Sequence, residues 1–503
     1  MPADPTPLPT KTDAEMRFDE ARRTVGIVAG PLMFLLLLAW PFESLTPEAH
    51  RLAAVMGLVI VFWVTEALPL PVTALLGPVL AVVLQVAPVG QTFRPFASPT
   101  IFLFIGSFIL AQALFVHRVN ERVAFGVLSM RIIGGRPSRI LIAYGLLAAV
   151  LSAWMSNTAT TAMLVPIGLS LVRFMESEAD IPKRYGTALM LMTSYCCSRG
   201  GMATPVGTPP NLIAIGMLDD QLDVRITFVR WMLFSVPVVL VLLLVIFAYL
   251  SWVGRTGVRQ IPGIAQIIAT RKRALGPWRR GEINAVVAFS ITICLWVGPG
   301  FLALVLGTDH PVARSVLASV PESVAALAGV VLLFLLPNSA TERTTITWRQ
   351  AAQIDWGTIL LFGGGLALGA LAGSTGLARV IGEGITGLVP TNELVALTFA
   401  AALFTVVLSE AMSNTAATNI AVPIVISIAL AAGVNPIFPV VAAALSASVA
   451  EMLPVSTPPN AIVYASGRVT ITEMIKYGVL MDVTAVTLVP ALVLLIAPYV
   501  VSS

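Results

Sequence analysis

The sequence contains one passage twice, and this repeat constrains the fold more than any other feature. Residues 152–167 read SAWMSNTATTAMLVPI and residues 409–424 read SEAMSNTAATNIAVPI, with 10 of 16 positions identical at a constant offset of 257. Each copy is followed by a second shared phrase, VGTPPN at 206–211 and VSTPPN at 455–460. Small polar, proline-broken segments at matching places in two halves are the best sequence indication of a transporter binding site. The repeat therefore predicts two related halves that build one site together.

The composition places both halves in a membrane. Hydrophobic residues make up 57 % of the 503 positions, charged residues only 11 %, and the mean hydropathy is +0.90. Apolar runs such as 228–252 are long enough to cross ~30 Å of hydrocarbon. These values exclude a soluble globular protein and predict an all-α polytopic membrane protein. Residues 1–24 are polar and contain no apolar signal-peptide core, so we expect the first span to be an anchor.

Two apolar stretches that carry the repeat, 140–172 and 394–430, predict re-entrant hairpins with SNT at their tips. The half-segments 140–155 and 159–172 are shorter than the ~20 residues that a full span needs. Irregular backbone at membrane depth is tolerated only where protein buries it or where it lines a wet cavity. We therefore expect about 11 transmembrane helices plus these two hairpins.

The charged loops predict how the chain is oriented. Segments 117–139, 253–280 and 468–476 are basic, which places them on the cytoplasmic side of the membrane. We therefore expect a protein of the bacterial inner membrane whose N-terminus is cytoplasmic and whose C-terminus is external. The net charge of +4 then reflects topology and not nucleic-acid binding. Residues 101–114 and 358–371 match at the same offset, with 4 identities of 14, and the loop charges predict that they run in opposite directions. This predicts an inverted-topology repeat. Its expected parts are a tail 1–24, a first half 25–252, a basic linker 253–282 and a second half 283–503.

The two phrases also predict what the site binds. Ser, Asn and Thr supply hydroxyl and carboxamide groups, and the short helix after each SNT offers free N–H groups to a carboxylate or sulfate. Carbonyl oxygens at the end of the preceding helix suit Na⁺. The paired prolines break the helix, and Gly207 allows the backbone to approach an ion closely. The absence of an acid within SNT or TPPN favours sodium over proton coupling.

These motifs resemble those of the divalent anion:sodium symporter family, whose members carry dicarboxylates, citrate or sulfate with sodium. The resemblance rests on the paired SNT and TPPN phrases, on TEALPLPVTALL at 65–76 and on GGMATPVGTPPN at 200–211, and it covers about 50–500. It implies a transporter that is not an enzyme, and a homodimer in which each protomer has a scaffold domain and a moving transport domain. Symport of a C4 dicarboxylate such as succinate, fumarate or malate is the expected activity; exchange, and citrate or sulfate as substrate, stay open.

The resemblance also implies the site residues. One sodium site would use Ser152, Ser156, Asn157 and Gly207, and a second would use Ser409, Met412, Asn414 and Ser456, with main-chain oxygens at Gly207, Met412 and Ser456. The substrate would contact Ser156, Asn157, Thr158, Thr208, Ser413, Asn414, Thr415 and Thr457.

Arg199 departs from the family pattern, because a small or apolar residue is expected at this place deep in a span. The first interpretation is a pair with a membrane carboxylate such as Glu410 or Glu451. The second is a fixed positive charge near the anion or a sodium site, where it would modulate coupling.

Other polar residues give weaker indications. Glu410, Glu451 and Asp482 are candidates for a proton relay, the main rival coupling scheme. Glu66 falls in the expected scaffold, and the glycines 363–365 predict close helix packing since no P-loop lysine follows. The remaining candidates point to no catalytic or metal chemistry: His50, His117 and His310 lie in loops or at span ends, and Cys196, Cys197 and Cys294 have no zinc or disulfide spacing. An intramembrane enzyme, against which these residues argue, is one rival class of protein, and a channel is the other.

Overall fold

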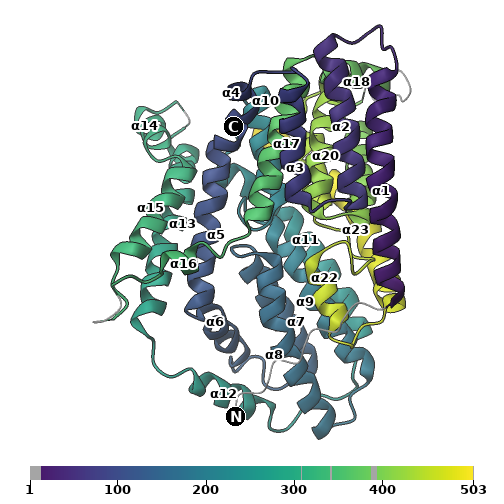
Figure 1. Cartoon of the computed structure of the whole chain (residues 1–503). Helices are drawn as coiled ribbons and strands as arrows, with labels where there is room; N and C mark the ends of the chain where they lie inside the picture. Colours follow the sequence, from purple (N-terminus) through teal and green to yellow (C-terminus); the bar gives the residue numbers. More distant parts are fainter. Residues whose placement is uncertain (1–12, 308, 340–342, 387–392, 502–503) are drawn as a thin grey trace.

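The computed structural model describes residues 13–307, 309–339, 343–386 and 393–501, and within these ranges all regular structure is helical (Figure 1). The first half contains α1 (Asp13–Ala39), α2 (Pro47–Thr65), α3 (Leu70–Val83), α4 (Val89–Phe93), η1 (Arg94–Ala97), α5 (Pro99–Val116), α6 (Val119–Leu128), α7 (Pro137–Ser152), α8 (Asn157–Glu178), α9 (Lys183–Met202), α10 (Pro209–Leu222) and α11 (Phe228–Val253). The remainder contains α12 (Ile264–Ala274), α13 (Arg280–Leu306), α14 (Pro311–Ser319), α15 (Glu322–Leu335), α16 (Trp348–Ala351), α17 (Trp356–Ser374), α18 (Leu377–Thr386), α19 (Leu394–Ala411), α20 (Asn414–Ala431), α21 (Ile437–Ala447), α22 (Pro458–Ala465) and α23 (Ile471–Val501).

Ten helices in the described part of the chain are long and apolar enough to cross a membrane. They become eleven if α14 and α15, which are bent by 54° at their junction, count as one span. This confirms a multi-pass membrane protein. The count includes α8, α19 and α20, which were expected as halves of the two hairpins, so it does not test the expectation of about 11 spans in addition to the hairpins. The set differs from expectation in one respect, because α8 has 22 residues and α19 and α20 have 18 each. The argument that the half-segments of the hairpins are too short to cross is therefore wrong for α8, whose helix continues through polar residues to Glu178.

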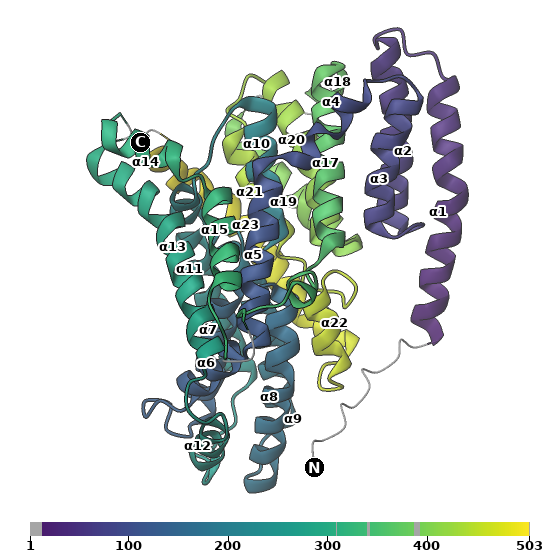
Figure 2. The same ribbon diagram turned by 60° about the vertical axis from the view of Figure 1, so that its left-hand side comes forward.

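The helices reproduce the repeat in register. Helices α17, α19 and α20 begin at residues 356, 394 and 414, each 257 positions after the first residue of α5, α7 and α8. Figure 1 shows that α5 descends from α4 to α6, whereas α17 ascends from α16 to α18. The helices α7 and α8 lie in the lower part of the molecule and α19 and α20 in the upper part, as the second view in Figure 2 also shows. Matched elements thus run in opposite directions.

The two halves interlock through their TPPN helices. The helix α10 of the first half packs on α20 of the second, and α22 of the second half packs on α8 and α9 of the first. Each TPPN phrase therefore lies against the SNT hairpin of the other half. This exchange brings helices whose first residues lie more than 200 positions apart in the sequence to one place.

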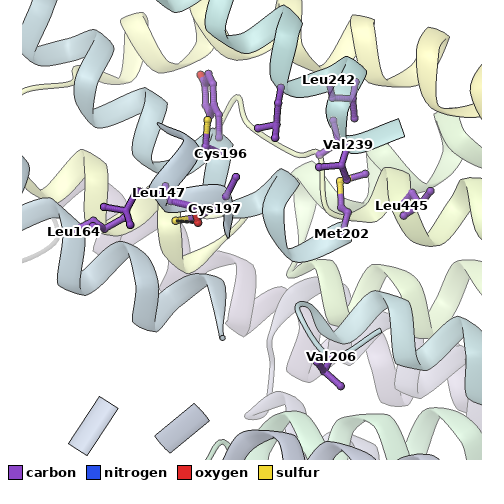
Figure 3. Close-up of a cluster of buried hydrophobic side chains, with 14 of the residues drawn as sticks. Leu147, Leu164, Cys196, Cys197, Met202, Val206, Val239, Leu242 and Leu445 are labelled. Carbon is purple, nitrogen blue, oxygen red and sulfur yellow. Dashed lines mark hydrogen bonds between the residues drawn. The ribbon is translucent and has the colours of Figure 1, made fainter. Parts of the chain in front are cut away.

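The helix α9 forms the centre of the protein. Every residue from Tyr185 to Met202 is buried, and α9 packs on α7, α8, α11 and α22. A helix that is buried on all sides needs no amphipathic stripe, which explains why polar and apolar residues alternate along it without a regular period. Figure 3 shows its side chains among those of the surrounding helices, with Leu147, Leu164, Cys196, Cys197, Met202, Val206, Val239, Leu242 and Leu445 labelled.

The N-terminal segment differs from the expected boundary. Residues 1–12 lie outside the described residues, and α1 begins at Asp13, inside the expected tail 1–24. The expected linker 253–282 contains α12, whose last turn carries Arg271, Lys272 and Arg273. Figure 1 places α12 and the start of α1 at the same end of the molecule, and the end of α23 at the opposite end.

Candidate functional site

The two SNT phrases form matching turns between helices. Ser156 and Ser413 take extended backbone conformations directly before α8 and α20, with ψ of 132° and 144°. The Ser413 hydroxyl caps α20 by accepting a hydrogen bond from the Ala416 N–H at 3.3 Å. Both helices begin at the asparagine of their SNT phrase, although the Ser156 side chain makes no such cap on α8.

The hydrogen bonds of the two asparagines are also matched. Asn157 Oδ1 accepts from Ser152 Oγ at 2.5 Å, and Asn414 Oδ1 accepts from Ser409 Oγ at 2.8 Å. A threonine four residues after each asparagine donates to the main-chain oxygen of that asparagine. This threonine is Thr161 in the first copy and Thr418 in the second. Each carboxamide is therefore held in a fixed orientation by the helix that precedes it.

Both tips and both TPPN breaks line one cavity of about 510 Å³, a size that accommodates a small ligand. All eight residues that the sequence predicts to contact substrate lie in its wall: Ser156, Asn157, Thr158, Thr208, Ser413, Asn414, Thr415 and Thr457. The first residues of α8, α10, α20 and α22 line the same cavity. Four positive helix ends therefore converge on it, which suits an anion. The first residues of α10 and α22 are paired prolines without N–H groups, so free N–H groups come from α8 and α20.

Of the residues predicted to bind sodium but not substrate, only Gly207 lines the cavity. Ser152, Ser409, Met412 and Ser456 are buried. A methyl group at Gly207 would lie 2.5 Å from the Gly201 carbonyl oxygen and 2.9 Å from the Ala153 carbonyl oxygen. The first break is thus a tight cradle of main-chain oxygens, the donor type that a hard cation prefers.

The second cradle also consists of oxygen atoms. Ser409 Oγ also lies 2.7 Å from the Ala447 carbonyl oxygen, and Ser456 Oγ donates to Glu410 Oε2 at 2.8 Å. Asn460 stabilises the second break, since its Nδ2 donates to the Leu453 main-chain oxygen at 3.1 Å. In the first half, Asn211 Nδ2 donates in the same way to the Thr204 main-chain oxygen. The donor set at both breaks fits sodium.

Arg199 pairs with a carboxylate and does not line the cavity. Its Nη1 donates to Glu451 Oε1 at 2.8 Å and to the Ser448 main-chain oxygen at 3.1 Å, and its side chain is only 1 % exposed. This geometry favours the first of the two interpretations of Arg199. The partner is Glu451, while Glu410 accepts hydrogen bonds from Met452 N–H and Ser456 Oγ instead.

Three polar residues of the cavity wall were not predicted from the sequence. Gln112 on α5 and Gln353 before α17 line the cavity, as does Asp355, whose carboxylate caps α17 by accepting from Thr358 N–H at 3.0 Å. Gln112 is a polar residue in the apolar run 101–114, and this was the available signal. Gln353 and Asp355 lie in a loop that carries no motif.

The remaining candidates have structural roles. Glu66 ends α2 in the left-handed region at φ 49° and pairs with Arg22 at 2.9 Å, with its side chain 45 % exposed. The glycine run packs closely, since a methyl group at Gly364 would lie 2.3 Å from the Ala74 carbonyl oxygen. Of the three histidines none lines the cavity, and among the described residues no group of three His, Cys, Asp or Glu could hold a metal.

A second, larger cavity of about 1130 Å³ continues from the first. The two share Gln112, Phe115, Ala162 and Gln353, and the second extends along α6 and α8 to α12. Arg271 and Arg279 line its far part. The site is therefore open toward the end of the molecule that carries the basic linker.

Comparison with known proteins gives matches over nearly the whole chain. Residues 21–501 match the family model described as the sodium:sulfate symporter transmembrane region. The chain is similar to the sodium-dependent dicarboxylate transporter SdcS of Staphylococcus saprophyticus, with 31 % identity over 490 residues that cover 94 % of this chain and 91 % of the relative. The protein of the same name from Staphylococcus aureus (strain bovine RF122 / ET3-1) is 32 % identical, covering 95 % and 92 %.

A solved structure shows a similar fold. The YdaH transporter of Alcanivorax borkumensis, whose crystal structure is described as having an unusual topology, aligns with a TM-score of 0.54 at 15 % identity, over 80 % of this chain and 85 % of that one. The family match spans nearly the whole chain and includes both SNT and both TPPN phrases. The chain therefore belongs to the sodium:sulfate symporter family, and it is a transporter, not an enzyme.

Proposed function

We propose that this protein imports a small divalent anion, a C4 dicarboxylate such as succinate, fumarate or malate, together with Na⁺. One observation carries the proposal: all eight predicted substrate residues line a single cavity at which four helix N-termini converge. The relatives at 31–32 % identity are named as sodium-dependent dicarboxylate transporters. A cavity of about 510 Å³ accommodates such an anion with its two carboxylates at opposite SNT tips.

Two sodium ions are the proposed coupling ions. Ser152, Ser156, Asn157 and Gly207 would hold the first, and Ser409, Met412, Asn414 and Ser456 the second. The support is chemical, because both breaks present hydroxyl, carboxamide and main-chain oxygens. The asparagine of each SNT phrase belongs to both the cavity wall and a cradle, so that ion and anion would share one side chain.

The proposed mechanism is of the elevator type. Helices α7–α11 and α19–α23 would form the transport domain, and the others the scaffold. The opposite directions of α5 and α17 support an inverted repeat (Figure 1). The SNT turns between α7 and α8 and between α19 and α20 line one cavity inside the protein, which supports re-entrant hairpins. With the basic linker in the cytoplasm, the second cavity would open inward, so that this conformation releases substrate to the cytoplasm.

Uptake into proteoliposomes tests the proposal. Labelled succinate, citrate and sulfate are offered separately, each with and without an inward sodium gradient. We expect succinate uptake that depends on the gradient and saturates, which a channel would not show. Preference for citrate or sulfate would change the substrate, and sodium-independent counter-flow would identify an exchanger. The resemblance also implies a homodimer, which light scattering of the purified protein tests.

A further inference from the structure

The two TPPN breaks are held by different kinds of group. At the first break, between α9 and α10, the donors are neutral: Trp231 Nε1 binds the Met202 oxygen at 3.2 Å and Ser235 Oγ binds the Ala203 oxygen at 2.9 Å. Asn211 Nδ2 completes the set with the Thr204 oxygen at 2.7 Å. In the described part of the chain, no charged side chain forms a hydrogen bond with this break.

The second break, between α21 and α22, is held by charged groups. Arg199 donates to its first residue, Ser448, and Asp482 Oδ1 accepts from the Glu451 N–H at 3.2 Å. Glu410 Oε1 accepts from the Met452 N–H at 2.9 Å. We call Arg199, Glu410, Glu451 and Asp482 the second-break cluster. All four are at least nine-tenths buried.

The second-break cluster has more negative than positive charge. Its three carboxyl groups face one guanidinium, and that guanidinium pairs with Glu451. Among the described residues no lysine, arginine or histidine forms a salt bridge with Glu410 or Asp482. The oxygens Glu451 Oε2 and Asp482 Oδ2 are buried and accept no hydrogen bond. A buried carboxylate of this kind is balanced either by a cation or by a proton.

The place of Glu410 favours sodium as the cation that balances the second-break cluster. Glu410 directly follows Ser409, and its carboxylate accepts the hydrogen bond of Ser456 Oγ. Both serines belong to the proposed second sodium site, so this carboxylate lies at the back of that site. The matching position in the first copy is Ala153, which has no charge.

We propose that the second-break cluster makes the two sodium sites unequal: the ion at the second site is the counter-ion of the cluster, binds more tightly and binds first. This rests on the proposed function and adds an order of binding to it. A unit charge a few ångströms away at an effective dielectric of ~20 changes an affinity by about ten-fold or more. The neutral groups at the first break provide no such attraction.

Sodium binding to the purified protein, without substrate, tests this directly. The readout is thermal stabilisation as a function of NaCl, with choline chloride holding the ionic strength constant. Asn157→Ala leaves the second site and Asn414→Ala leaves the first. We expect the sodium Kd of the Asn157→Ala protein to be about ten-fold lower than that of the Asn414→Ala protein. Adding Glu410→Gln should raise the Kd about ten-fold in the first background and leave it unchanged in the second.

Two further variants keep the test decisive. Asp482→Asn retains the acceptor for the Glu451 N–H, changes no residue of the proposed sodium sites, and should weaken binding only in the Asn157→Ala background. Glu282→Gln removes another buried carboxylate, one that pairs with Arg122 at 2.9 Å, and should change neither Kd. Size-exclusion profiles identify any variant that fails to fold. If Glu410→Gln fails to fold, Asp482→Asn provides the test, and if Asp482→Asn fails, Glu410→Gln provides it.

Three results would overturn the proposal. The first is equal Kd values in the two backgrounds. The second is a Glu410→Gln effect of the same size at both sites. The third is no effect of Glu410→Gln or Asp482→Asn, which would show that a proton between the carboxyl groups, not sodium, balances the cluster. Absence of any sodium stabilisation in the wild-type protein would instead contradict the proposed function itself.

Discussion

Arg199 and Glu451 form a buried ion pair, with 2.8 Å between Nη1 and Oε1, that joins the first half of the chain to the second. The pair links the central helix α9 to the break between α21 and α22. Both side chains are almost fully inaccessible, at 1 % and 0 % exposure. Removal of one partner leaves the other charge buried and alone, which is more costly than loss of the pair as a whole.

We therefore expect Arg199→Ala to lower the stability of the protein by about 3–5 kcal/mol. Thermal unfolding of the detergent-purified variant measures this. The double variant Arg199→Met with Glu451→Leu removes both charges and should recover much of the loss. Substrate Kd should change little in any variant that folds, because Arg199 does not line the cavity. A stable Arg199→Ala protein with sharply weakened binding would contradict the structural role.

Asn157→Ala and Asn414→Ala should each abolish sodium-driven uptake while the protein still folds. Each amide lines the substrate cavity and accepts the hydrogen bond of a serine behind it. Loss of either removes a ligand for anion and ion together. Uptake of labelled succinate is the measurement. Asn435→Ala is the matched control, since Asn435 is exposed and only caps the start of α21; near wild-type uptake by either SNT variant would show that the site is elsewhere.

Gly207→Ala should impair transport, because the added methyl group would enter the first oxygen cradle, 2.5 Å from the Gly201 oxygen. Overpacking of this kind costs typically 1–3 kcal/mol, and the cradle must open to relieve it. We expect weaker sodium binding together with a lower melting temperature. Gly298→Ala is the control, since no atom lies within 4 Å of a methyl group there. Unchanged sodium affinity in Gly207→Ala would exclude this cradle as a sodium site.

Uptake should rise with sodium concentration with a Hill coefficient above one, because two matched breaks predict two cation sites. It should not respond to a proton gradient when substrate protonation is held constant. Flux measurements with independently set sodium and proton gradients distinguish the two couplings. Uptake driven by protons in sodium-free buffer would shift the coupling role to Glu410, Glu451 and Asp482.

Asp220 predicts a pH dependence at the surface. It lies in the exposed last turn of α10, where loss of hydration and the neighbouring Asp219 raise its pKa to about 6. The usual value is ~3.9, so the charged form is disfavoured in this conformation. Its contribution to stability is therefore most favourable below about pH 4, declines as the pH rises to about 6, and stays low above. Melting temperatures between pH 4 and 8 should show this difference between wild type and Asp220→Asn, and identical profiles would disprove it.

The sequence alone determined the doubled site, because its information is local. The SNT and TPPN phrases specify a turn, a helix start and a set of oxygen donors wherever they occur, and their constant spacing shows that they occur as a pair. For this reason all eight predicted substrate residues lie in one cavity wall. The starts of α17, α19 and α20 follow the same offset of 257 for the same reason.

Only the tertiary structure decided which distant groups meet. Arg199 and Glu451 are 252 residues apart, and nothing in either local sequence distinguishes Glu451 from Glu410 as the partner. Gln353 and Asp355 reach the cavity because the loop before α17 folds over it. The helix α8 extends through polar residues to Glu178, and Glu176 near its end pairs with Arg468 of the second half. A local pattern specifies backbone geometry and chemistry, whereas the pairing of buried charges depends on how α10 and α22 cross between the halves.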